Sequence, residues 1–155
     1  MKRNSWSYLF YFLLFDSSTD EIKKLSATCL LGYVHLWDLK SPQNMAKAPE
    51  ITEKIDKSSQ TIWGGRYLYQ NRNVFVTFDG SGSVKILKYK YKGDSNKVQG
   101  DQTIRTGGVE KLQECQISEQ PISAFDWSPD KLGLAVSTSF DQKIRVLAFT
   151  NMENL

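Results

Sequence analysis

The sequence is poor in the residues that build metal and catalytic sites. Its 155 residues include a single histidine, His35, and two cysteines, Cys29 and Cys115, which lie far apart inside apolar stretches. Two such cysteines do not make a disulfide framework, and no Cys/His pair has the spacing of a zinc site. We therefore expect buried, reduced thiols in a cytosolic protein, with His35 at a half-exposed strand position.

The same scarcity argues against an enzyme. One histidine excludes most histidine-based triads unless His35 is the base, and neither cysteine lies in a reactive context. The glycines at 64–65 and 80–82 are not followed by a helical pattern, so neither group predicts a phosphate-binding loop. Paired aspartates lie beside turns, where capping is the simpler role. The sequence predicts no catalytic residue, no cofactor and no metal.

The sequence also lacks a strong cluster of charges of one sign. The net charge is +3, and the hydrophobic (40%) and charged (24%) fractions are ordinary for a soluble globular protein. The one local basic run, Lys85, Lys88, Lys90 and Lys92, alternates with apolar and aromatic residues. That alternation favours the solvent edge of a strand over a nucleic-acid patch. A chromatin- or nucleic-acid-binding module, with contacts through this run, stays open as an alternative.

A membrane-spanning run is also missing. Met1-Lys2-Arg3 and the apolar run Tyr8–Phe15 imitate a signal peptide, and a secreted or membrane-associated enzyme is therefore a further alternative. The run is only eight residues long, whereas a bilayer crossing takes about 20. No small-residue cleavage site follows it. We expect a buried strand there.

Helical periodicity is nearly absent, and the chain instead has the pattern of short strands bounded by turns. Strands are expected at 8–15, 25–31, 33–39, 50–55, 61–68, 74–78, 83–91, 109–117, 122–127, 134–139 and 143–149. Residues 92–108 are polar and carry four glycines, which predicts a flexible loop.

Three stretches of the chain repeat one another without gaps. They are GYVHLW from Gly32, GSVKIL from Gly82 and QKIRVL from Gln142, and their starts lie 50 and 60 residues apart. With allowance for long loops, this spacing is typical of a repeat of about 40–45 residues with four strands per unit, the blade of a β-propeller. Because one blade cannot bury both of its faces, the repetition predicts stacked sheets.

The last repeat contains three elements in the order that WD-repeat propellers use. Trp127-Ser128-Pro129-Asp130 ends one strand, Leu134 to Asp141 (LAVSTSFD) supplies the next strand and its turn, and Ile144-Arg145-Val146-Leu147 supplies the third. Trp37-Asp38 provides the literal WD dipeptide. On these residues the chain resembles the WD-repeat β-propeller family. The resemblance implies an all-β fold and gives structural roles to Trp37, Asp38, Trp127, Ser128, Pro129, Asp130, Ser139 and Asp141.

Other stretches resemble one branch of that family, the C-terminal part of Monad-type WD-repeat proteins, which are cytoplasmic factors of axonemal dynein arm assembly. The stretches are KLSAT at 24–28, SQTIW at 59–63, QNRNVF at 70–75, LKYKY at 87–91 and residues 120–142. The resemblance implies a non-enzymatic scaffold or adaptor in the cytoplasm. Its implied partners are a prefoldin-like and RuvB-like co-chaperone complex and dynein chains, with no small-molecule substrate and no membrane.

The chain also departs from the family pattern. The family's propeller has seven blades, whereas residues 1–155 predict one partial propeller domain with blades at about 8–55, 61–118 and 122–150. Leu147 stands at the tryptophan position of the last blade, and the residues aligned with Asp141 are Leu31 and Ser81. We therefore expect blades held mainly by apolar packing, and a product that is truncated, a splice form or part of a larger assembly. Besides Lys85, Lys88 and Lys90, Trp63 is a candidate contact for partners, although packing between sheets is its simpler role.

Overall fold

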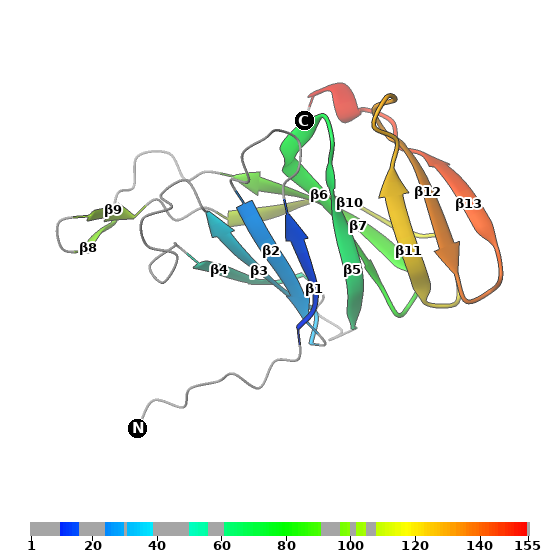
Figure 1. The fold of residues 1–155 in the computed structure, drawn as a ribbon, viewed down its shortest axis with the longest axis horizontal. Coiled ribbons are helices and arrows are strands. Elements are labelled where there is room, and N and C mark those ends of the chain that lie inside the picture. Colours follow the sequence, from blue (N-terminus) through cyan, green and yellow to red (C-terminus); the bar gives the residue numbers. More distant parts are fainter. Residues whose placement is uncertain are drawn as a thin grey trace.

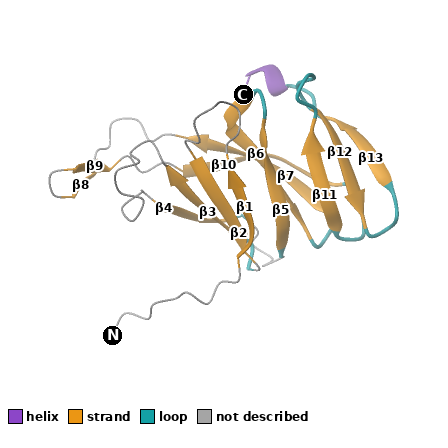
Figure 2. Cartoon of the chain, viewed as in Figure 1, coloured by secondary structure: helices purple, strands orange, loops and turns teal. Residues whose placement is uncertain are grey.

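The computed structural model describes residues 10–15, 24–29, 31–38, 50–55, 61–90, 97–99, 102–104 and 108–154. Nearly all regular structure in these segments is β-strand (Figure 2). The strands are β1 (Phe10–Phe15), β2 (Lys24–Cys29), β3 (Tyr33–Asp38), β4 (Glu50–Lys54), β5 (Ile62–Leu68), β6 (Asn71–Asp79), β7 (Ser83–Lys90), β8 (Lys97–Gln99), β9 (Gln102–Ile104), β10 (Gly108–Gln116), β11 (Ile122–Trp127), β12 (Leu134–Ser139) and β13 (Ile144–Ala148).

Three antiparallel sheets form the body of the molecule. Blade 1 has the strand order β1-β2-β3-β4, blade 2 the order β5-β6-β7-β10, and blade 3 the order β11-β12-β13. The first strands of the three blades, β1, β5 and β11, lie side by side, and the sheets fan out from them (Figure 1). The fold is therefore all-β and is a partial β-propeller of about three blades, as the sequence predicted.

Two apolar clusters hold the blades together. The first joins blades 1 and 2 and contains Val34, Leu36, Ile62, Tyr67, Phe75, Leu87 and Tyr89. The second joins blades 2 and 3 and contains Leu68, Val74, Val76, Phe78, Val84, Ile86, Ile122, Phe125, Trp127, Ala135 and Met152. Since a fully buried aliphatic or aromatic side chain contributes about 1.5–3 kcal/mol, these interfaces are the main source of stability in the described part of the chain.

The middle blade is covered on both faces, and its sequence reflects this. In β6, all six residues from Val74 to Asp79 are buried, and four of them are apolar, so buried and exposed positions do not alternate there. In blade 3 the strands alternate between covered and exposed positions, as in Leu134–Ser139. One face of blade 3 packs against blade 2, and the other faces solvent.

The repeated stretches begin at the same backbone feature. Gly32, Gly82 and Gln142 have φ angles of 76°, 87° and 64° and lie in the turns before β3, β7 and β13. At Gly82, a Cβ atom would lie 2.1 Å from the carbonyl oxygen of Ser118, so a glycine is required there. The gap-free alignment of the three stretches therefore corresponds to equivalent positions in the three blades.

Several details differ from the sequence-based expectations. The predicted loop at 92–108 contains β8 and β9, which pair with each other as a separate two-stranded sheet. The predicted strand at 8–15 is β1, whose bounds are Phe10–Phe15. Residues 152–154, which carried no signal, form a 3-10 turn that buries Met152 in the second cluster. The blade limits at 8–55, 61–118 and 122–150 remain a prediction.

Candidate functional site

The turns at one end of blades 2 and 3 each carry an ion pair between an aspartate and a cationic side chain. These turns are 79–82, 118–121 and 140–143, and we call their end of the sheets the lower rim. The opposite end of the same sheets carries the turns at 69–70 and 128–133, which we call the upper rim. The two rims are distinct because β12 runs from the turn at 128–133 to the turn at 140–143.

At the lower rim, Arg145 of β13 pairs with the Asp141 carboxylate in an ion pair that is half-buried. The Ser139 hydroxyl and the Lys143 backbone N–H also donate to this carboxylate, the latter at 3.1 Å. The Arg145 guanidinium is the main cause, and the Ser139 hydroxyl the second, that hold the pKa of Asp141 well below its ordinary value. In turn, Asp141 raises the pKa of Arg145. Ser139 and Asp141, to which the family resemblance gives structural roles, thus lie together at this turn.

Blade 2 has the equivalent arrangement with its serine and aspartate exchanged. Lys85, which aligns with Arg145, lies 2.5 Å from the carboxylate of Asp79. Ser81, which aligns with Asp141, donates its hydroxyl to Asp79 at 2.6 Å. The backbone N–H groups of Ser81 and Ser83 donate to the same oxygen at 2.9 and 3.0 Å.

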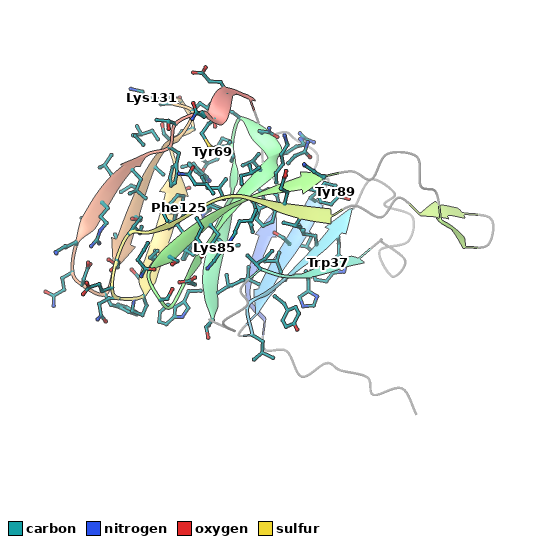
Figure 3. The ribbon with its side chains drawn as sticks, turned by 180° about the vertical axis from the view of Figure 1, so that it is seen from behind. Trp37, Tyr69, Lys85, Tyr89, Phe125 and Lys131 are labelled. Carbon is teal, nitrogen blue, oxygen red and sulfur yellow. The ribbon has the colours of Figure 1, made fainter. Side chains whose placement is uncertain are left out.

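This arrangement corrects two expectations. The sequence pointed to Ser81 as the residue in the place of Asp141 and found no carboxylate in blade 2, yet Asp79 provides one. Lys85 was expected at the solvent edge of a strand and is 4% exposed (Figure 3). The signal that could have found the pair was Asp79-x-Ser81, the reverse order of Ser139-x-Asp141, before an aligned cation.

A chain of hydrogen bonds joins the two pairs across the blade interface. The Ser83 hydroxyl donates to the side-chain oxygen of Gln116 at 2.7 Å. The amide nitrogen of Gln116 donates to the carbonyls of Ser81 and Ser118 at 2.5 and 2.6 Å. The Ser118 hydroxyl then donates to Asp141 at 3.2 Å. Blades 2 and 3 are thus joined by polar contacts as well as by apolar packing. The sequence predicted apolar packing as the main contact.

The same rim carries an aromatic pair. Trp63 at the start of β5 is half-buried and packs edge-on against Phe140, with ring centroids 5.2 Å apart. Phe140 is 56% exposed. Trp63 therefore packs between blades 2 and 3 beside the exposed ring of Phe140, and its role as a contact for partners remains a prediction.

The motif Trp127-Ser128-Pro129-Asp130 lies at the upper rim, where its residues close a turn and contact blade 2. Trp127 is buried, and its indole N–H donates to the Arg66 carbonyl at 3.4 Å. The Ser128 hydroxyl accepts the backbone N–H of Lys131 at 3.1 Å, which closes the turn. The Gln70 side chain of blade 2 donates to the Pro129 carbonyl at 2.8 Å. Asp130 is exposed.

In blade 1, Trp37 is half-buried, and its ring stacks on that of His35 with centroids 6.0 Å apart. His35 is 6% exposed, so the expected half-exposed position was wrong. Asp38 is the last residue of β3, and its side chain lies outside the described residues, as does that of Cys29.

The three lysines of the basic run that the structure describes, Lys85, Lys88 and Lys90, do not form a continuous basic surface. Lys90 is exposed but lies 2.6 Å from Glu110 on the neighbouring strand β10. Lys88 is half-buried, and Lys85 is buried against Asp79. Since Lys90 and Lys85 are each paired with a carboxylate, the described part of the run offers a weak field for a phosphate backbone.

Cys115 is the one cysteine whose side chain lies within the described residues. The Cys115 thiol has its pKa raised, first by burial and then by the charge of Glu114, which makes it a poor nucleophile. Among the described residues, no group of three His, Cys, Asp or Glu side chains could hold a metal ion. No helix in those residues combines the length and the apolar character that a bilayer crossing needs.

Comparison with known proteins relates the chain to one group. No protein-family model matches it. The chain is 41% identical over 145 residues to dynein axonemal assembly factor 10 of Xenopus tropicalis, 39% identical over 145 residues to that of Homo sapiens, and 36% identical over 146 residues to that of Chlamydomonas reinhardtii. Each match covers 92% of this chain and 40% of the relative. The chain is therefore a homologue of the dynein axonemal assembly factor 10 proteins over 92% of its own residues, and it spans about 40% of their length.

Proposed function

We propose that the chain takes part in the assembly of axonemal dynein arms as a non-enzymatic scaffold. The observation that carries the proposal is its 36–41% identity to proteins named for dynein axonemal assembly, along 92% of its residues. Identity at this level over nearly the whole chain supports a shared fold and shared surfaces. Rigid sheets that present turns at two rims suit the binding of protein partners.

As partners we propose dynein chains and a prefoldin-like and RuvB-like co-chaperone complex, met in the cytoplasm. These partners are implied by the Monad-type resemblance. For their contact surface we propose the aromatic pair Trp63 and Phe140 at the lower rim. An exposed aromatic ring braced by a second one is a common anchor in interfaces, and Phe140 is the most exposed aromatic side chain among the described residues, at 56%.

Affinity capture from ciliated cells, followed by quantitative mass spectrometry, tests this proposal. The baits are the tagged chain, its Phe140→Ser variant and its Leu132→Ser variant. Leu132 is 37% exposed and lies at the upper rim, so its variant is a matched loss of exposed apolar surface. We expect the wild-type and Leu132→Ser baits to recover dynein chains or co-chaperone subunits. Loss of a central interface residue weakens binding by about 30-fold, so recovery by Phe140→Ser should fall accordingly.

Two results would contradict the proposal. Recovery of neither class of partner by a bait with a cooperative thermal transition would contradict the scaffold role. Equal recovery by all three baits would remove the aromatic pair as the contact while leaving the scaffold role intact. Nuclease treatment of the lysate should leave recovery unchanged, and no observation in the described lysine run favours a nucleic-acid partner instead.

A further inference from the structure

The two rings of the aromatic pair at the lower rim belong to different blades. Trp63 lies in β5 of blade 2, and Phe140 lies in the turn between β12 and β13 of blade 3. The 5.2 Å separation of their ring centroids therefore depends on how the two blades are held against each other. Any contact that sets the relative position of the blades at this rim also acts on the pair.

Each ring rests on one of the turns of the lower rim. A Cβ atom at Gly80 would lie 3.0 Å from the indole nitrogen of Trp63, so this ring packs directly on the turn at 79–82. Phe140 is part of the turn at 140–143. Whatever joins these two turns therefore joins the two rings as well.

The segment that connects blades 2 and 3, residues 117–121, is bonded to both turns, and we call it the linker. The backbone N–H of Ser118 donates to the Gly82 carbonyl at 3.2 Å. At the other end of the linker, the Pro121 carbonyl accepts the backbone N–H of Phe140 at 3.0 Å. The linker backbone is thus fixed to one turn of each blade.

The side chains of Gln116 and Ser118 extend this connection. The Gln116 amide nitrogen donates to the carbonyl of Ser81, in the turn of blade 2, and to the carbonyl of Ser118, in the linker, at 2.5 and 2.6 Å. Its amide oxygen accepts the Ser83 hydroxyl at 2.7 Å, which fixes the orientation of the amide group. The Ser118 hydroxyl donates to Asp141, in the turn of blade 3, at 3.2 Å.

We propose that Gln116 is a positioning residue for the aromatic pair, and this inference rests on the proposed role of the pair as the contact surface for partners. Its amide group holds the linker against the turn that supports Trp63, and the linker holds the turn that contains Phe140. Gln116 is exposed at the end of β10, so it acts through hydrogen bonds and not through apolar packing. A partner of the pair then binds a surface that is formed in advance, which lowers the entropic cost of association.

Fluorine NMR on the 155-residue chain labelled with 5-fluorotryptophan tests the positioning without any partner. The Trp63 resonance is assigned by its loss in Trp63→Phe, and Phe140→Ser gives its position without the second ring. Gln116→Met keeps the length of the side chain and removes its three hydrogen bonds, so it should shift the Trp63 resonance toward that position. Gln113→Met, the same change at another exposed position of β10, is the matched control and should leave it in place.

The resonance of Trp127, which is buried between blades 2 and 3, reports on general loosening of the interface and should stay in place in every variant. Ser118→Ala is a second variant, because it removes the bond to Asp141 and should shift the Trp63 resonance in the same direction. It decides the result if Gln116→Met does not fold. An unmoved Trp63 resonance in the folded variants, or an equal shift of Trp127, would overturn the positioning role whatever partners bind.

Affinity capture with Gln116→Met and Gln113→Met baits tests the consequence for binding. Recovery of dynein chains or co-chaperone subunits by Gln116→Met should fall about fivefold, the effect of losing about one net hydrogen bond. Gln113→Met should match the wild-type chain. Equal recovery by both variants, beside a wild-type bait that recovers partners, would overturn the role of Gln116 in the contact. A wild-type bait without partners would count against the proposed function alone, because the NMR result still decides whether Gln116 positions the pair.

Discussion

Blade 2 and blade 3 contain aligned sequences, yet their surroundings differ. The apolar positions Val84 and Ile86 of blade 2 are 0% and 1% exposed, whereas their counterparts Ile144 and Val146 in blade 3 are both 74% exposed. The same contrast holds for the ion pairs: the side chains of Lys85 and Asp79 are 5% and 2% exposed, and those of Arg145 and Asp141 are 22% and 17% exposed. The sequence pattern of a blade therefore sets which face of the sheet each side chain lies on. The neighbouring blade sets how deeply that side chain is buried, and so how much it contributes to the free energy of unfolding.

The largest effect should come from the buried pair. Lys85→Met leaves the Asp79 carboxylate buried without its cation, which should lower the free energy of unfolding by about 3–5 kcal/mol. In the same strand, Lys90→Met removes an exposed pair with Glu110 and should cost less than about 1 kcal/mol. Urea denaturation of both variants measures the difference.

The double variant Lys85→Met/Asp79→Asn separates charge from packing. Because it removes both charges together, it should recover most of the lost stability. A double variant as unstable as Lys85→Met alone would show that the loss arises from side-chain packing and not from an uncompensated carboxylate.

The next effect compares the apolar positions directly. Ile86→Ala should lower the free energy of unfolding by about 2–5 kcal/mol, since it leaves a cavity between two blades. The aligned Val146→Ala should change it by less than about 0.5 kcal/mol. Both losses are measured by urea denaturation. Equal losses would contradict the view that coverage, and not the blade pattern, sets the contribution of these positions.

Much of this fold could be predicted from the sequence because its signals are local. Alternating strands, the turns at Gly32, Gly82 and Gln142, and the motif around Trp127 each depend on residues close together in the chain. What could not be predicted depends on which side chains the folded strands place against one another. His35 and Lys85 occupy alternating positions that predict partial exposure, yet both are buried. The His35 ring stacks on that of Trp37, and the Asp79 carboxylate, 2.5 Å from Lys85, neutralises that buried cation.

The candidate site shows the same limit. The pair of Asp79 and Lys85 could not be found by alignment, because the aspartate and serine of blade 2 stand in the reverse order to Ser139 and Asp141. A position-by-position comparison then places Ser81 opposite Asp141 and finds no aspartate. The hydrogen bonds from Gln116 through Ser118 to Asp141 join segments that no sequence repeat connects. Trp63 was named from the sequence with two possible roles, whereas Phe140, which packs against it at the rim, carried no signal of its own.

The smallest effect concerns the half-buried pair of blade 3 and depends on pH. Because Arg145 and Ser139 lower the pKa of Asp141 in the folded state, this carboxylate stabilises the fold at pH values above about 4, the ordinary pKa of an aspartate. The contribution is lost as the pH falls through the lowered folded-state value. The gap in unfolding free energy between wild type and Asp141→Asn should therefore be constant above about pH 5, begin to narrow as the pH falls below about 4, and close only once the pH is below the lowered folded-state value. Asp126→Asn, whose carboxylate is half exposed and lies 3.9 Å from Arg66, should show a much smaller gap at any pH, and a gap for Asp141→Asn that persists into strong acid would refute the charge-based role of this pair.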